Sequence, residues 1–338
     1  MRSEPRPSGS GGFRRGGALL MVLWLSAALS AIALSVALSV RSEITRADTA
    51  MEGLRAYYLA CGAADRALNY MLYGPGPRNP LGVPRFWEPG IPLLLMPFPE
   101  GEAAVEVIPE SSKLNVNQVS DRELATLLAV LGVPPEGAQQ IAMAVLNWRG
   151  GGGSPLDQMY LMRSPSFRAP HASLEQIEEL MSIAGITPEL FHGGYTRTLQ
   201  GGLVPRPGLR DCLSVYSGGT ALDLNTAEPA VMLALGGPPQ GVETLVNMRR
   251  QMVIRQQQVG AVMGLLGPAA GRFRLGGDRI YTLRATARMR RPDGVLSDLR
   301  RTVAMTVQID SKSSPDLFRV LAWQDQAAGQ SIFSVWPQ

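Results

Sequence analysis

The stretch ALLMVLWLSAALSAIALSVALSV, residues 18–40, decides the fold, because this long apolar run contains no charged residue. As a helix it would be about 34 Å long, enough to cross a hydrocarbon core of about 30 Å. The preceding residues, 1–17, carry four arginines against one glutamate. A basic flank of this kind keeps the N-terminus cytoplasmic and sends the following chain outward.

The helical pattern does not stop at Val40 but continues to the breaker Gly74-Pro75. Apolar residues recur there at alternating spacings of about three and four, which is typical of one stripe along a helix. The sequence therefore predicts one helix of about 80 Å, whose second half is an amphipathic stem. The stripe consists of Ile44, Ala47, Met51, Leu54, Tyr58, Cys61, Leu68 and Leu72.

A short basic leader that ends in glycine, followed by such a two-part helix, resembles the type IV pilins and pseudopilins. The resemblance implies cleavage by a prepilin peptidase between Gly17 and Ala18, with the Gly16–Gly17 bond as the second choice. Most family members carry Glu at the fifth mature position, and that position is Val22 here. An absent Glu is typical of one subclass, the minor pseudopilin K of type II secretion. An unprocessed single-pass anchor is the alternative.

The net charge of +4 comes mostly from the leader, whose removal subtracts +3 and leaves +1. The basic excess is therefore a signal for membrane topology and does not indicate a nucleic-acid-binding surface.

Both cysteines, Cys61 and Cys212, would face an oxidising periplasm, so the sequence allows a disulfide between them. The alternative for Cys61, which lies on the apolar stripe, is a free thiol packed as a small hydrophobe.

Beyond the stem, residues 101–110 (GEAAVEVIPE) read as a strand that a proline ends, and a long helical region follows. Two stretches in that region, 114–149 and 222–249, resemble each other. Each opens Leu-x-φ-Asn, turns at Pro-Pro-x-Gly and ends in Arg, and the first has four more residues, about one helical turn, before its proline pair. The matching residues are Asn117 and Asn225, expected as N-caps or turn formers, and the breakers Pro134, Pro135, Pro238 and Pro239.

A weaker helix pair is expected at residues 173–190, where Ser173 and Gln176 have the spacing of a capping box. The two stronger pairs are similar to helix-hairpin-helix modules, which bind DNA phosphate through backbone N–H groups of a glycine turn. Proline has no N–H, and neither turn carries a cluster of Lys or Arg. Nucleic-acid binding is therefore disfavoured.

The repeats resemble the helical insertion of pseudopilin K, whose members can bind calcium there. In many members a Trp is followed by an acidic loop, whereas Trp148 is followed here by RGGGGSPLDQMY. Asp157 is the one carboxylate of this loop, and calcium takes six to eight oxygen ligands. Asp157 is thus a weak calcium candidate, and no other cofactor is expected.

The C-terminal region predicts a second set of strands. Residues 281–290 alternate apolar with Thr or Arg, a turn sequence RPDG follows, and apolar residues alternate again over 303–309. A third candidate strand covers 317–323. One face can pack on the stem, and the arginine row is expected on a solvated outer face.

The sequence shows no catalytic set: the two histidines, His171 and His192, lack metal-ligand spacing and lie among Pro and Gly. We therefore expect a protein that is not an enzyme.

The expected fold is α+β. A pilin-like helix packs on a small antiparallel sheet, and an all-α helix-hairpin-helix or SAM-like domain is inserted between strands. The expected parts are a leader (1–17), a transmembrane half-helix (18–40), a stem and first strand (41–110), the insertion (111–270) and the C-terminal strands (271–338).

The resemblance implies a minor pseudopilin of the inner membrane, with a cytoplasmic N-terminus and a periplasmic remainder, at the tip of the type II secretion pseudopilus. Its implied partners are minor pseudopilins I and J, the assembly platform, the prepilin peptidase, the secretin and secreted proteins. The alternatives are a membrane-anchored DNA-uptake protein that uses its hairpins, and a minor pilin of a type IV pilus.

Overall fold

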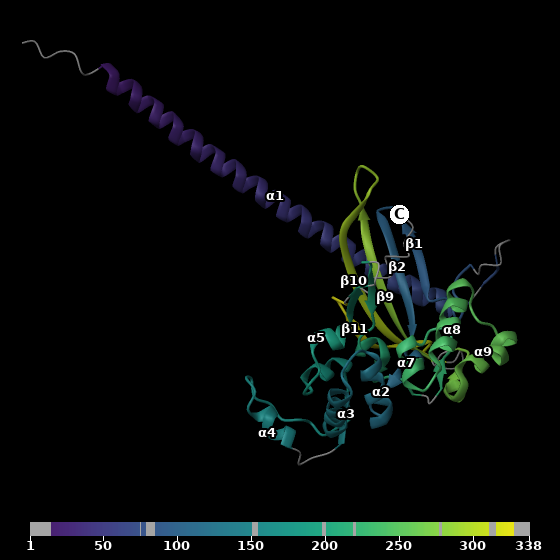
Figure 1. The fold of residues 1–338 in the computed structure, drawn as a ribbon. Coiled ribbons are helices and arrows are strands. Elements are labelled where there is room, and N and C mark those ends of the chain that lie inside the picture. The colour runs from purple at the N-terminus through teal and green to yellow at the C-terminus, as the bar shows by residue number, and fades with distance from the viewer. Residues whose placement is uncertain are drawn as a thin grey trace, which may run out of the picture. The chain divides into compact units, whose positions relative to one another are not determined.

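The computed structural model describes residues 15–74, 76–78, 85–150, 155–197, 201–218, 221–276, 279–310 and 316–327 (Figure 1). Most of the expected leader lies outside these ranges. The chain divides into two units, residues 1–55 and 56–338, which are described separately below.

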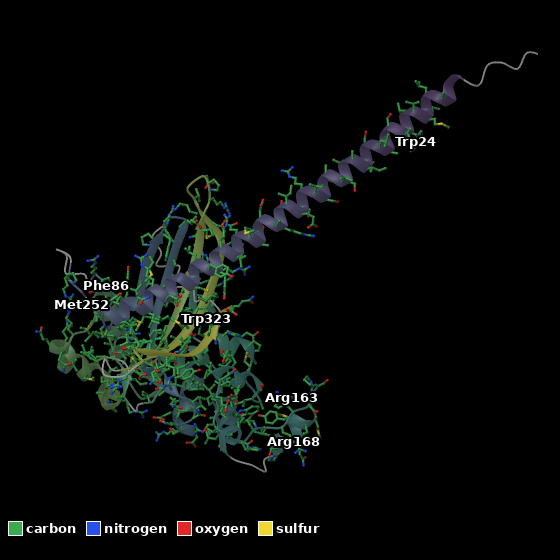
Figure 2. All side chains as sticks on the ribbon, turned by 180° about the vertical axis from the view of Figure 1, so that it is seen from behind. Trp24, Phe86, Arg163, Arg168, Met252 and Trp323 are labelled. Atoms are coloured by element: carbon green, nitrogen blue, oxygen red, sulfur yellow. The ribbon has the colours of Figure 1, made fainter. Side chains whose placement is uncertain are left out.

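Helix α1 (Arg15–Tyr73) is a single helix of 59 residues, about 88 Å long, so the predicted continuation past Val40 is confirmed. Its side chains are exposed from residue 17 to residue 51, including the large apolar ones from Leu19 to Val40. Figure 2 shows one of them, Trp24, projecting from this part of the helix. Among the described helices, α1 is the one long and apolar enough to cross a membrane.

The second unit contains a five-stranded sheet in the order β1-β2-β9-β10-β11, with every neighbouring pair antiparallel. The strands are β1 (Leu93–Phe98), β2 (Gly101–Pro109), β9 (Ile280–Arg290), β10 (Leu296–Ile309) and β11 (Phe318–Gln324). The predictions for β2, β9, β10 and β11 are confirmed. Strand β1 was not expected, because its segment contains prolines and a continuous apolar run with no alternation.

The end of α1 packs on one face of this sheet, but not through the expected stripe. Buried alanines at helical spacing form the contact, among them Ala56, Ala60, Ala64 and Ala67. Alanine lets the helix backbone approach the strands closely. The alanine face therefore packs on the sheet, although its side chains are small. Of the expected stripe, Met51, Leu54 and Tyr58 are exposed, and only Leu68 is fully buried.

The segment between β2 and β9 forms the inserted region, which has a hydrophobic core separate from that under α1. In Figure 1 its helices lie around and below the lower end of the sheet. Their bounds are α2 (Asp121–Val130), α3 (Pro135–Gly150), α4 (Pro155–Leu161), α5 (Pro188–His192), α6 (Leu209–Cys212), α7 (Pro229–Ala234), α8 (Pro239–Gln251) and α9 (Val259–Leu266).

The insertion also holds short strands, so the expected all-α composition needs a correction. Strand β3 (Leu114–Asn115) pairs in parallel with β6 (Leu213–Ser214), and β7 (Leu222–Asp223) with β8 (Phe273–Arg274). An antiparallel hairpin joins β4 (Gly194–Arg197) and β5 (Leu203–Arg206). Two-residue pairings are too short to leave an alternating pattern in a sequence.

Four 3₁₀ turns complete the insertion: η1 (Glu110–Ser112), η2 (Ile177–Ser182), η3 (Gln256–Gln258) and η4 (Gly267–Arg272). Turn η2 and α5 occupy the region of the predicted weaker helix pair. The predicted cap at Ser173 is wrong. Glu179 instead accepts bonds from the backbone N–H groups of Glu175 and Gln176, so the cap lies three residues later.

Candidate functional site

Two helical hairpins, α2–α3 and α7–α8, form the most distinctive part of the insertion, and they confirm the predicted repeat. Helix α2 has 10 residues and α7 has 6, which is the expected difference of one turn. Both turns pass through a glycine with positive φ, Gly132 at 90° and Gly236 at 91°. Only a residue without a side chain adopts this conformation easily, so both turns follow the same backbone path.

The proline pairs lie at these turns as predicted. Helix α3 begins at Pro135 and α8 at Pro239, each preceded by its second proline. Proline is well placed at the first helical position, where an N–H would lack a helical partner. The same residues remove N–H donors from the turn, so neither hairpin offers the full backbone cradle that a phosphate needs.

Asn117 and Asn225 do not cap helices, which corrects one of the two expected roles. Ser120 caps α2, and Glu228 precedes α7. Each asparagine instead bonds the backbone of a distant loop in two directions. Asn117 donates to Leu174 O (3.0 Å) and accepts from Leu174 N (2.8 Å), and Asn225 makes the same pair with Ile254 (3.1 and 3.0 Å).

Two arginines make a second matching contact that the sequence did not predict. Arg149 donates to the carbonyls of Val116 and Val119, each at 2.7 Å. Arg249 reaches the equivalent carbonyls in the second hairpin, with Ala227 O at 2.7 Å. The common Arg at the end of both stretches was the available signal. These contacts fasten the second helix of each hairpin to its opening turn.

The calcium candidate Asp157 faces a histidine. Its Oδ1 lies 3.2 Å from His171 Nε2, and both side chains are partly exposed. His171 Nδ1 lies 3.0 Å from the carbonyl of Asn147. Among the described residues no group of three metal-ligating side chains gathers, although residues 151–154 of this loop lie outside them. The arrangement ties α4 to the following loop, and Asp157 is the one carboxylate that this loop offers to a calcium ion.

The two cysteines are not brought together. Cys61 lies on α1 beside the core under the sheet, and Cys212 is fully buried in the separate core of the insertion. Both are free thiols. Burial raises the pKa of the Cys212 thiol well above its ordinary value.

The arginines of β9 were expected on a solvated outer face, and this expectation needs a correction because one of them is buried and three of them have partners. Arg284 is buried and donates to Glu106 Oε2 on β2 at 3.1 Å. Arg290 pairs with Glu102 at 2.7 Å, and Arg288 donates to Ser297 O at 2.8 Å. The insertion covers part of this face. In the β2–β9 register Glu106 lies opposite Arg284, whereas Glu102 lies opposite Arg288, two residues before its ion-pair partner Arg290.

The residues tied to processing lie on α1. Gly17 and Ala18 are neighbours near the start of the helix, and Val22 lies about one turn further along the same exposed segment. A side chain added at Gly17 would meet nothing within 4 Å. The fold therefore imposes no glycine at this position.

Comparison with known proteins gives three findings. Residues 105–193 match the family of type II secretion system protein K. No curated protein matches the chain. A chain in the solved structure of the GspK–GspI–GspJ complex from the enterotoxigenic Escherichia coli Type 2 Secretion System shares 17% identity, with a TM-score of 0.52. The match covers 84% of this chain and 100% of that one.

These matches confirm the resemblance to minor pseudopilin K that the sequence indicated. The solved chain has a fold similar to the α+β fold described here, over 84% of this chain. The matched family is a structural component of a secretion system and not a class of enzymes.

Proposed function

We propose that this chain is a minor pseudopilin that occupies the tip of the type II secretion pseudopilus. The observation that carries the proposal is the match of residues 105–193 to protein K, which covers the first hairpin inside the insertion. In this role the chain starts assembly with other minor pseudopilins. It then helps export folded proteins from the periplasm across the outer membrane.

The first part of α1 would anchor the chain in the inner membrane. It is long and apolar enough to span a bilayer, and its large side chains are exposed. The arginines before it favour a cytoplasmic N-terminus and place the rest in the periplasm. Prepilin peptidase would then cut between Gly17 and Ala18.

The partners proposed are pseudopilins of the I and J kinds, because the similar solved chain belongs to a complex with GspI and GspJ. Exposed apolar side chains along α1 supply a contact surface. Met51 is 53% exposed and Leu54 is 49% exposed, although both are large apolar residues outside the expected membrane segment. Helices of neighbouring subunits would cover them, as apolar faces are covered in other helical assemblies.

Co-purification of the full-length chain, in detergent, with I-type and J-type subunits from the same genome tests this proposal. Leu54→Asp should reduce recovery of the partners about tenfold, since a carboxylate would be buried in the contact. Thr49→Asp adds the same charge to another face of α1, where the threonine hydroxyl bonds only to the Thr45 carbonyl, and should leave recovery unchanged. Failure of the unaltered chain to retain either subunit would contradict the proposal.

A further inference from the structure

The two helical hairpins close in the same way, but through connections of very different length. In the second hairpin four residues, 250–253, separate the arginine that bonds the opening turn from the residue that bonds Asn225. In the first hairpin the equivalent connection to the residue that bonds Asn117 covers residues 150–173. Four residues are therefore enough to close this type of hairpin, and the long connection (residues 150–173) is an addition that its closure does not require.

The long connection is packed firmly on the insertion. Tyr160, on α4, is completely buried, and the centroid of its ring lies 5.6 Å from that of Trp148 and 5.1 Å from that of Phe167. The Tyr160 hydroxyl accepts a hydrogen bond of 3.1 Å from the backbone N–H of Ala184, which follows η2. This packing fixes the side chains of the connection that face outward.

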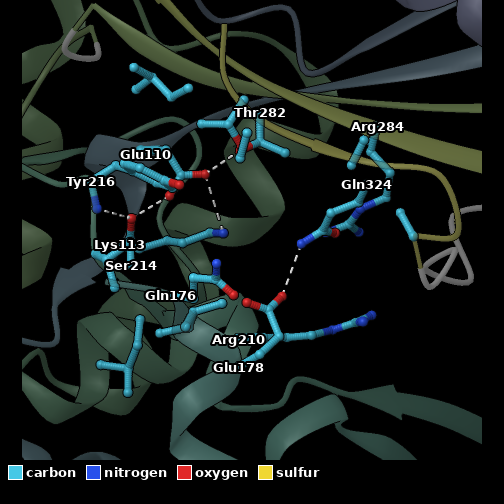
Figure 3. Close-up of a pocket in the computed structure, with 18 of the residues that line it drawn as sticks. Glu110, Lys113, Gln176, Glu178, Arg210, Ser214, Tyr216, Thr282, Arg284 and Gln324 are labelled. Carbon is cyan, nitrogen blue, oxygen red and sulfur yellow. Dashed lines mark hydrogen bonds and ion pairs between the residues drawn. The ribbon is translucent and has the colours of Figure 1, made fainter. Parts of the chain in front are cut away.

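Turn η2, which supports the connection, is itself tied to the sheet. Glu178, on η2, accepts a bond of 2.9 Å from the amide of Gln324 on β11, across a cleft between the insertion and the sheet (Figure 3). Arg163 donates to the carbonyl of Ser182, at the end of η2, at 3.1 Å, and also lies over the ring of Tyr160. A surface held in this way loses little conformational entropy when a partner binds.

The outer side of α4 exposes large apolar side chains. Leu161 is 47% exposed, and Met162 is 83% exposed, more than any other large apolar residue that the structure describes. Met159, three residues before Met162, is also exposed. Figure 1 shows α4 at the margin of the insertion, away from the sheet. Exposed apolar residues gathered on a firmly packed surface indicate an interaction site.

The charges around α4 favour an acidic partner. Asp157, the one carboxylate of the long connection, already faces His171 at 3.2 Å. Arg163 and Arg168 are both exposed, and neither has a carboxylate within ion-pair distance among the described residues (Figure 2). Met and Arg are both enriched in protein interfaces. A complementary segment therefore carries carboxylates beside its apolar side chains.

A protein segment fits this surface better than a lipid bilayer does. Surfaces that bind bilayers insert Trp, Phe or Leu and use clusters of several cations, each of which contributes about 1 kcal/mol. The connection offers two arginines, and its rings, Tyr160 and Phe167, pack into the core. The flexible thioethers of methionine instead suit the irregular surface of another protein.

We propose that α4 and the residues that follow it bind an acidic amphipathic segment of another protein. Leu161 and Met162 receive its apolar side chains, and Arg163 and Arg168 pair with its carboxylates. The site goes beyond the assembly role proposed above and does not depend on it, because none of its residues lies on α1.

Fluorescence anisotropy of labelled peptides tests the site on the full-length chain in lipid nanodiscs. The probe is acetyl-Glu-Leu-Leu-Glu-Glu-Leu-Leu-Glu-amide. One control peptide has Lys in place of every Glu, and the other has Ser in place of every Leu. We expect the probe to bind at least about tenfold more tightly than either control, after subtraction of its binding to empty nanodiscs.

Met162→Glu should weaken binding of the probe about tenfold, because it removes an apolar contact and places a like charge against the carboxylates. Arg168→Glu should weaken it by a similar factor. Met252→Glu is the matched control, since Met252 is 57% exposed in the short connection of the second hairpin, and it should have no effect. Unchanged thermal melting of the three variants verifies that they are folded.

Equal affinity for the three peptides would overturn the proposal, as would equal weakening by Met162→Glu and Met252→Glu. A bilayer as the true partner has its own signature. A fluorophore on Met162→Cys, in a chain with Cys61→Ser and without peptide, would then be quenched by brominated lipids in the nanodisc. Such quenching would also overturn the proposal, and we expect none.

Discussion

Asn117 and Asn225 hold two loops in place with the same pair of hydrogen bonds, although their partners are 57 and 29 residues away. A primary amide both donates and accepts, so one side chain can replace a strand neighbour for a short backbone segment. The repeat in the sequence predicted that the two residues were equivalent. It did not single out Leu174 and Ile254, although each lies just before a capped 3₁₀ turn, η2 or η3.

The processing site gives a prediction at the residue scale. Replacing Gly17 with a bulky residue should block cleavage while leaving the helix intact, since nothing lies within 4 Å of a side chain there. Mass spectrometry of the protein extracted from membranes should find Ala18 as the first residue of the unaltered chain and an intact leader in Gly17→Phe. Met1 at the start of the unaltered, assembled protein would contradict the assignment.

The cysteines give a second prediction. Cys61 is partly exposed and should react with a maleimide in the native protein. Cys212 is fully buried and its thiol pKa is raised, so it should react only after denaturation. Peptide mapping after labelling distinguishes the two. A Cys61–Cys212 cross-link in protein purified without reductant would show that the allowed disulfide forms after all.

Among the elements, α1 shows where large side chains misled the interpretation of the sequence. Met51, Leu54 and Tyr58 form the more hydrophobic stripe, but it is the alanine face of α1 that packs against the sheet. Alanine contributes little to hydrophobic periodicity, and close approach to a sheet is a property of the assembled fold. The strands were easier to predict, because β9 alternates over its length and β10 carries a large apolar residue at every second position from Val303 to Ile309.

The alanine face carries a prediction about stability. Ala64 is completely buried, so Ala64→Leu should overpack the contact and reduce the free energy of unfolding by about 1–3 kcal/mol. The same change at Ala47, which is exposed on α1, should alter it by less than about 0.5 kcal/mol. Chemical denaturation in detergent, followed by circular dichroism, measures both. Equal effects of the two changes would contradict the assignment of the packed face.

The hairpins carry another prediction. Their turns lose N–H donors to Pro134, Pro135, Pro238 and Pro239, so the protein should not bind duplex DNA. Gel shifts of the full-length chain at low salt provide the measurement. Sub-micromolar binding that weakens steeply as salt rises would support the DNA-uptake alternative instead.

At the scale of the whole molecule, the bulk of the insertion favours the proposed position at the tip. The insertion adds a second hydrophobic core to a pilin-like unit, and this bulk would crowd lateral neighbours in a filament shaft. The long helix and the interruption of the sheet were predictable from the sequence. The contacts between the insertion and the outer sheet face were not, because they join residues such as Glu110 and Thr282 that are distant along the chain.

Val22 supports the tip position on electrostatic grounds. Most pilins carry a carboxylate at this place, which the resemblance pairs with the N-terminal amine of an adjoining subunit. The first subunit of a stack has no subunit above it to supply that amine, and an unpaired carboxylate in hydrocarbon costs several kcal/mol. Val22 avoids this cost, so Val22→Glu should be poorly incorporated or misplaced.

The position of labelled protein on overproduced pseudopili tests the central claim most directly. We expect one copy per filament, at the end distal to the membrane, when the chain carries a gold or fluorescent label and filaments are imaged and counted. Label along the whole length of the filaments, at a stoichiometry near that of the major subunit, would contradict the assignment to the tip.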